Sequence, residues 1–248
     1  MFPYIPLGDG LLLDSWRVMI TAGILGGSLV SLILLHGEIG RFRAVILVAS
    51  MAIGALLGAH LAHWLLHPGL SGWDLYGIFV FWSNGHSLLG ALALCTLLLL
   101  AISRTVPEIS FWPTADAFSL GVPVGLFFAR IGCYMKGCCW GTPIGEGHPF
   151  HGFSVKLIRN DLLALHPVQL YSAAAALAIF CILFSLHRRN RTPGLLAPLF
   201  LLLYAAARFV LEFFRGDTSP LCAGLTLHQG ICILVFVGGR RIWCIRLR

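Results

Sequence analysis

The stretch VQLYSAAAALAIFCILFSLHRRNRTPGLLAPLFLLLYAAARFVLEFF, residues 168–214, decides the fold class of this chain. It holds two apolar runs, 168–187 and 194–214, separated by a short connection rich in arginine. A bilayer core about 30 Å thick needs about 20 helical residues for one crossing. We therefore expect two consecutive membrane helices here, joined by a basic loop.

The same pattern continues along the chain. Of its 248 residues, 58% are hydrophobic and 11% are charged, whereas soluble domains are about 45–50% apolar and about 25% charged. This composition excludes a soluble enzyme, a disordered chain and a nucleic-acid binder. We expect an all-α polytopic membrane protein with about seven transmembrane helices in one domain, 1–248, and no strands, because open sheet edges cannot face lipid. The remaining apolar runs are 16–35, 44–66, 76–102, 116–131 and 221–238.

The distribution of arginine predicts the orientation. Arginines gather in the connections 36–43, 103–115 and 187–193 and in the C-terminal tail, and cytoplasmic loops are rich in Lys and Arg. The N-terminal arm and the 67–74 loop have none. The net charge of +7 thus serves orientation and contact with lipid phosphate. We expect the N-terminus outside, the C-terminus in the cytoplasm, and 132–167 as an extracytoplasmic loop region.

Charged residues inside the apolar runs are the first candidates for a site. Arg208, Glu212 and Arg215 follow one another at i, i+4 and i+7, which places them on one face of a helix. Two arginines against one glutamate leave positive charge for a phosphate, although a self-neutralising ion pair is the alternative. Arg130 closes the fourth run, and its guanidinium offers a fork of donors that matches phosphate oxygens.

A glycine-rich turn follows Arg130. Gly132, Gly137 and Gly141 lie in a segment that could bring backbone N–H groups close to a bound ligand. The spacing alone is a weak signal, but its position after an arginine at the end of a span favours a binding site.

Polar residues also occur at one helix start and inside the third apolar run. In HPVQLY, 166–171, Pro167 fits the beginning of a helix, and Gln169 and Tyr171 are expected at headgroup depth. A tyrosine there is also a common interfacial anchor. Asn84 and His86 lie in the third run, where His86 either takes a proton near neutral pH or bonds a neighbouring helix.

Three of the eight cysteines form a cluster. Cys133, Cys138 and Cys139 fit no CxxC pattern, so they form a disulfide, bind a metal with His148 or His151, or stay reduced. Adjacent cysteines rarely bridge each other, and a disulfide is favoured only in an oxidising compartment. We favour one disulfide or free thiols over a metal.

Three segments together resemble one family. ARIGCYMKGCCWG (129–141), HPVQLY (166–171) and ARFVLEFFRGD (207–217) resemble the prolipoprotein diacylglyceryl transferases of bacteria. The resemblance implies a multi-pass transferase of the inner membrane that moves a diacylglyceryl group from phosphatidylglycerol to the lipobox cysteine thiol in a prolipoprotein signal peptide, the first step of lipoprotein maturation. It implies membrane lipids as surroundings and no cofactor, metal or nucleic acid.

The resemblance also implies residue roles. Arg130 and Arg208 would stabilise the phosphate leaving group, and Glu212 would fix Arg208. Independently of the resemblance, an acceptor thiol must lose its proton before it attacks, and His86 is the candidate base. The substrate-binding candidates, with Arg130 again among them, are Gly132, Gly137, Gly141, His166, Gln169, Tyr171 and Arg215.

This sequence departs from the family pattern at several positions. Cys133 and Cys138 stand where the family has Asn and Glu, Lys136 replaces a second Asn, and Ser172 replaces a Glu. Trp16 stands where a tyrosine is common. The family histidine also aligns one residue before His86.

These departures keep three alternatives open. The first is a diverged paralogue with another acceptor. The second is a membrane redox or metal-handling protein built on the cysteines and on His60, His63 and His67. The third is a lipid-binding scaffold.

Overall fold

The computed structural model describes residues 4–6, 12–66, 87–158, 161–190, 192–218 and 224–246. Its helices are α1 (Ser15–Ile39), α2 (Arg41–Leu66), α5 (Leu88–Thr105), α6 (Phe111–Lys136), α7 (Val168–Arg189), α8 (Leu196–Glu212) and α9 (Leu227–Arg246). Four short strands accompany them: β1 (Tyr4–Pro6), β2 (Leu12–Asp14), β3 (Val155–Ile158) and β4 (Asp161–Ala164). They pair as two antiparallel hairpins, β1 with β2 and β3 with β4.

The described helices confirm a polytopic, mainly helical membrane protein. Five of them, α1, α2, α5, α6 and α7, are long and apolar enough to cross a membrane. Each of the seven predicted apolar runs overlaps one helix, and the start of the 76–102 run lies outside the described residues. The expectation that strands are absent is wrong. Both hairpins lie outside the helices, so the argument against strands in lipid does not apply to them.

Several helix ends differ from those predicted. α6 continues to Lys136, and α9 begins at Leu227 and runs to Arg246. Arg240 and Arg241 are therefore helical rather than part of a tail. The predicted ends followed the change from apolar to polar residues, whereas a helix ends where its last carbonyl groups find other partners.

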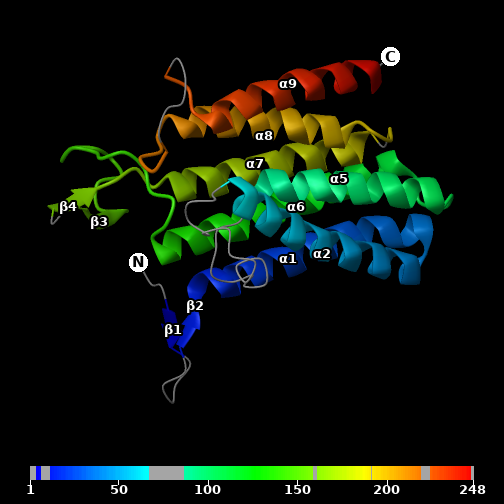
Figure 1. Cartoon of the computed structure of the whole chain (residues 1–248), viewed down its shortest axis with the longest axis horizontal. Coiled ribbons are helices and arrows are strands. Elements are labelled where there is room, and N and C mark those ends of the chain that lie inside the picture. The colour runs from blue at the N-terminus through cyan, green and yellow to red at the C-terminus, as the bar shows by residue number, and fades with distance from the viewer. Residues whose placement is uncertain are drawn as a thin grey trace. The chain divides into compact units, whose positions relative to one another are not determined.

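The chain packs as two compact units, residues 1–27 with 118–248, and residues 28–117. In the first unit α7 packs against α8 and α8 against α9, and Figure 1 shows these three helices side by side. The β3–β4 hairpin extends beyond the C-terminal end of α6 and the start of α7 (Figure 1). This end of the first unit holds most of the predicted site residues.

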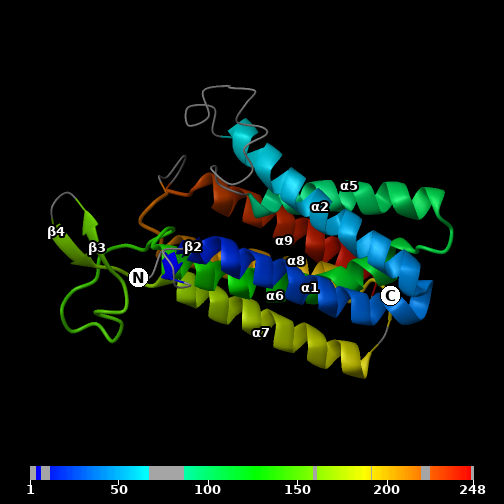
Figure 2. The same cartoon turned by 90° about the horizontal axis from the view of Figure 1, so that it is seen from below.

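The second unit is built on α2 and α5, which lie against each other (Figure 2). Their backbones approach so closely at Gly58 and Gly90 that a Cβ on Gly58 would lie 2.5 Å from the Gly90 carbonyl oxygen. Small residues permit such close packing of membrane helices. Arg43 and Glu108 form an exposed ion pair at 3.2 Å in the same unit.

Candidate functional site

A narrow pocket in the first unit lies among α6, α7 and α8. Arg130 of α6, Ser172 of α7, and Tyr204 and Arg208 of α8 belong to its lining. Its volume of about 30 Å³ has room for one or two water molecules. The structure thus brings Arg130 and Arg208 to the wall of one pocket, as the phosphate hypothesis requires.

Glu212 organises the charged residues behind this pocket. Its side chain is 1% exposed and accepts a hydrogen bond from Arg208 at Oε2. The Thr226 hydroxyl donates to Oε1 at 3.0 Å, and His228 Nδ1 lies 3.6 Å from the same oxygen. The pairing of Arg208 with Glu212 that the sequence predicts is therefore present, and it is buried.

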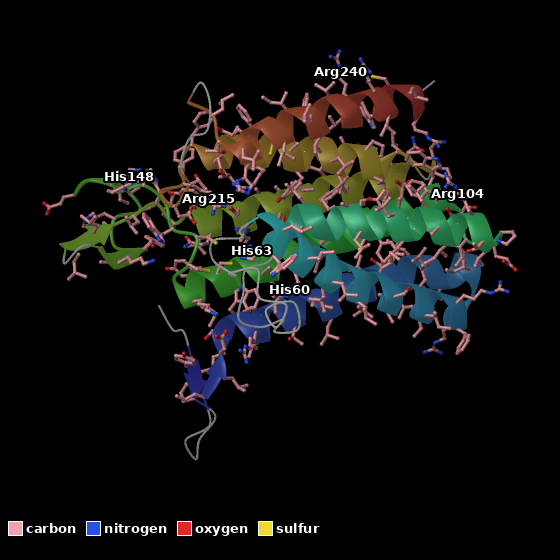
Figure 3. All side chains as sticks on the ribbon, in the orientation of Figure 1. His60, His63, Arg104, His148, Arg215 and Arg240 are labelled. Atoms are coloured by element: carbon pink, nitrogen blue, oxygen red, sulfur yellow. The ribbon has the colours of Figure 1, made fainter. Side chains whose placement is uncertain are left out.

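Arg215 lies elsewhere than predicted. α8 ends at Glu212, and the Arg215 N–H donates to the Glu212 carbonyl in the tighter turn that follows. The prediction that Arg215 shares a helical face with Arg208 and Glu212 is therefore wrong. Its guanidinium instead forms two hydrogen bonds of 2.8 Å to Asp217, and its backbone pairs with Gly141. Figure 3 shows Arg215 at the hairpin end of the unit and Arg240 at the other end of α9.

The charges of this cluster leave a surplus. Arg130, Arg208 and Arg215 carry three positive charges, against the two carboxylates of Glu212 and Asp217. Among the residues that the structure describes, no carboxylate forms an ion pair with Arg130. The surplus positive charge therefore belongs to Arg130, on the pocket wall.

Sequence reasoning missed the residues that hold Glu212 from α9. The Thr226 N–H donates to Gln229 Oε1 at 2.9 Å, and the Gln229 N–H donates back to the Thr226 hydroxyl at 3.3 Å. This reciprocal pair is a capping box at the start of α9. The motif TLHQ, 226–229, carries the Thr-x-x-Gln signal that could have revealed it.

Two of the three predicted glycines play structural roles. Gly132 lies inside α6, and a Cβ there would come within 2.8 Å of Met19 Cβ. Gly137, with φ of +75°, ends the helix, and its N–H donates to the Cys133 carbonyl at 3.0 Å. The expectation that these N–H groups face a ligand is wrong for both, because the helix backbone already uses them.

The third glycine, Gly141, lies in a segment that joins two helix ends. The Thr142 N–H donates to the Phe214 carbonyl at 2.9 Å, and the His166 N–H donates to the Thr142 carbonyl at 3.0 Å. A Cβ on Gly141 would lie 2.5 Å from the His166 carbonyl oxygen. Only glycine permits this approach, which links the start of α7 to the end of α8.

His166 and Tyr171 belong to an aromatic group beside this segment. His166 Nδ1 lies 3.3 Å from the Tyr171 hydroxyl, and the two rings contact His148, Phe150 and Phe214. Burial and the neighbouring His148 lower the pKa of His166, so its imidazole is neutral near pH 7. Neither side chain belongs to the lining of the pocket that contains Arg130 and Arg208.

Gln169 positions the turn that carries the three clustered cysteines, residues 133–139, which we call the cysteine turn. Its side chain is buried, and Nε2 donates to the Cys138 carbonyl at 2.6 Å. Ser172, one helical turn further along α7, lines the pocket and donates to the Val168 carbonyl at 2.8 Å. The predicted headgroup-depth residue Gln169 therefore contacts protein backbone.

Cys133, Cys138 and Cys139 are free thiols, which is one of the two arrangements that the sequence favoured, and the alternative disulfide is not formed. Their sulfur atoms all lie within 4.8 Å of one another. Hydrogen bonds from Cys133 and Cys138, together with the positive charges of Arg130 and Arg215, lower the pKa of the Cys139 thiol. Within the described ranges, no histidine joins these sulfurs.

His86, the candidate base, lies outside the described residues, as do Asn84 and His67. His60 is buried in α2 of the second unit. In the described part of the chain, neither His60 nor His63 belongs to a group suited to a metal ion.

The fold and the pocket define a class: a polytopic membrane protein with a cationic pocket at the ends of its helices. The family model of the prolipoprotein diacylglyceryl transferases matches residues 7–245, and the chain belongs to this family.

Curated relatives named phosphatidylglycerol–prolipoprotein diacylglyceryl transferase support this assignment. The protein of an Azoarcus species is 30% identical over 84% of this chain and 74% of its own length. The protein of Mannheimia succiniciproducens is 31% identical over 72% and 64%. That of Tolumonas auensis is 32% identical over 74% and 70%.

Proposed function

We propose that this protein transfers a diacylglyceryl group from phosphatidylglycerol to the lipobox cysteine thiol of a prolipoprotein, as its family and the names of its relatives indicate. One structural observation carries the proposal. Arg130, which no described carboxylate neutralises, shares a pocket with Arg208, which the buried Glu212 holds in place.

The chemistry explains why such a pocket is needed. The acceptor thiolate forms a C–S bond to the terminal carbon of the diacylglyceryl group. The bond between that carbon and the phosphate ester oxygen breaks, and glycerol phosphate leaves. The phosphate gains one negative charge as the bond breaks. Fixed donors aimed at a developing charge stabilise the transition state, and the forked guanidinium groups of Arg130 and Arg208 suit a phosphate. The pocket must widen to admit a headgroup, because about 30 Å³ holds only water.

Other residues support this reaction in our proposal. His86 takes the proton of the acceptor thiol. Arg215 and Gly141 hold the end of α8 against the cysteine turn, and His166 and Tyr171 form the neighbouring aromatic wall that meets the lipid headgroup or the signal peptide. Gly132, Gly137 and Gln169 act by shaping the turn.

The membrane arrangement that we propose follows the arginine distribution. The whole chain, 1–248, acts as one transferase domain of the bacterial inner membrane, with seven spans. The N-terminus and the 132–167 region lie outside, and the C-terminus lies in the cytoplasm. Short loops rich in arginine stay on the cytoplasmic side.

Complementation tests the function. The chain is expressed in a bacterium depleted of its own transferase, and the N-terminus of a lipoprotein is analysed by mass spectrometry. We expect the diacylglyceryl mass on the cysteine, and a loss of about 100-fold in transfer rate for Arg208→Lys, because an ammonium lacks the fork. Arg43→Lys in the exposed pair with Glu108 is the matched control and should leave the rate unchanged.

Two outcomes would reject parts of this proposal. Growth without the diacylglyceryl mass would favour a paralogue with another acceptor. Full activity of His86→Ala would remove His86 from the mechanism.

A further inference from the structure

The cysteine cluster has no part in the transfer chemistry described above. Cys133 is in the last turn of α6, and Cys138 and Cys139 follow the end of that helix. All three sulfurs lie within 4.8 Å of one another as free thiols. Thiolate sulfurs lie about 2.3 Å from a bound zinc ion, so three sulfurs that surround one such ion in a plane are about 4.0 Å apart. Small side-chain movements therefore suffice for one ion to contact all three.

The backbone forms this cluster without any ion. The N–H groups of Gly137 and Cys138 both donate to the Cys133 carbonyl, at 3.0 and 3.1 Å, which folds the chain back over the end of α6. Cys139 adopts φ of +57°, a left-handed conformation that non-glycine residues rarely take. Such backbone strain gathers at functional sites.

A buried side chain fixes the turn from a second helix. Gln169 of α7 is 1% exposed and donates to the Cys138 carbonyl at 2.6 Å. The backbone of the turn is therefore held at Cys133 and at Cys138, so this part of the turn loses little freedom when an ion binds. Preorganisation of this kind raises affinity.

The surrounding charge favours an anionic complex. Three thiolates and a monovalent ion carry a net charge of −2, and the positive charges of Arg130 and Arg215 act on Cys139. The donor set is sulfur alone, since no histidine or carboxylate of the described residues joins the group. Soft thiolates bind Cu(I), zinc and iron–sulfur clusters, but structural zinc sites have four protein ligands. The number of converging sulfurs, three, therefore favours a three-coordinate ion of the Cu(I) class.

We propose that Cys133, Cys138 and Cys139 form a binding site for one Cu(I)-class ion in three-coordinate thiolate ligation. Binding forms three metal–sulfur bonds and releases the thiol protons to solvent, with no change in oxidation state.

Copper binding to the purified full chain in detergent tests this site. Cu(I), kept reduced under anaerobic conditions, is titrated in competition with a chromogenic Cu(I) chelator. We expect one tightly bound Cu(I) per chain, and X-ray absorption of the wild-type complex should show three sulfur neighbours. Cys133→Ser, Cys138→Ser and Cys139→Ser should each weaken binding at least about 100-fold, since second-shell changes alone cost 10–100-fold.

The exposed cysteines provide the control. Cys181→Ser and Cys244→Ser should leave the affinity unchanged. Equal weakening by these variants, two or fewer sulfur neighbours, or tighter binding of Zn(II) than of Cu(I) would overturn the proposal. Absorption data from the wild-type complex keep it testable if a serine variant fails to fold. Transfer activity is measured separately, so a failed copper site and a failed transferase assignment remain distinguishable.

Discussion

Replacing Glu212 by glutamine should destabilise the protein strongly. The Glu212 side chain is 1% exposed and pairs with Arg208, which is 13% exposed. The amide keeps an oxygen for the Thr226 hydroxyl, so the change removes mainly the charge. Removing one partner of a buried ion pair costs about 3–5 kcal/mol, because the other charge stays buried and uncompensated. The neighbouring Arg215, 4.0 Å from Glu212, adds repulsion in the same direction.

Unfolding of the purified protein in mixed micelles by added SDS, followed by tryptophan fluorescence, measures this loss. A loss of 3–5 kcal/mol also corresponds to a melting temperature lower by about 10 °C for a chain of this size. Glu108→Gln is the matched control. Its pair with Arg43 is about half exposed on both sides, and exposed pairs contribute about 0–1 kcal/mol.

A second substitution tests the cause. If the uncompensated charge of Arg208 destabilises Glu212→Gln, adding Arg208→Met should restore part of the free energy of unfolding, since the two residues are in contact and their effects do not add. The reasoning fails if Glu212→Gln costs no more than Glu108→Gln, or if Arg208→Met only adds to the damage.

Three further predictions concern residues near the pocket: Gly141, Gln229 and His166. Gly141→Ala should destabilise the protein and impair transfer, because the new Cβ would lie 2.5 Å from the His166 carbonyl oxygen. Gly145→Ala is the control: its new Cβ would have no neighbour within 4 Å, so it should change neither stability nor transfer in the same assays. Gln229→Ala should lower the free energy of unfolding by about 1 kcal/mol through loss of the capping box, and an equal transfer rate would show that the box serves stability alone. The pKa of His166 is lower in the folded protein than in the unfolded chain, so protonation favours the unfolded chain, and the free energy of unfolding should fall as the pH drops below about 6.5. His148→Phe should reduce that fall. An unchanged dependence of stability on pH in this variant would contradict the assigned cause.

The sequence determined the membrane class and the identity of the chemistry. Apolar runs long enough to cross a bilayer need no tertiary contact to be recognised, because helix formation in lipid depends on local backbone hydrogen bonds. The pairing of Arg208 with Glu212 was predictable for the same reason, since it depends only on the spacing along one helix. The forked side chain of Arg130 likewise indicates a phosphate ligand from the sequence alone.

Tertiary structure decided how these residues meet. Because α8 ends at Glu212, Arg215 is not part of the helix. Its backbone pairs with Gly141, which lies two residues after Cys139. Thr226 reaches Glu212 from the position just before α9, and the three sulfurs converge because Gly137 reverses the chain. Helix ends and contacts between distant segments depend on the partners that each backbone and side chain finds in three dimensions. A sequence pattern of fixed period does not contain those partners.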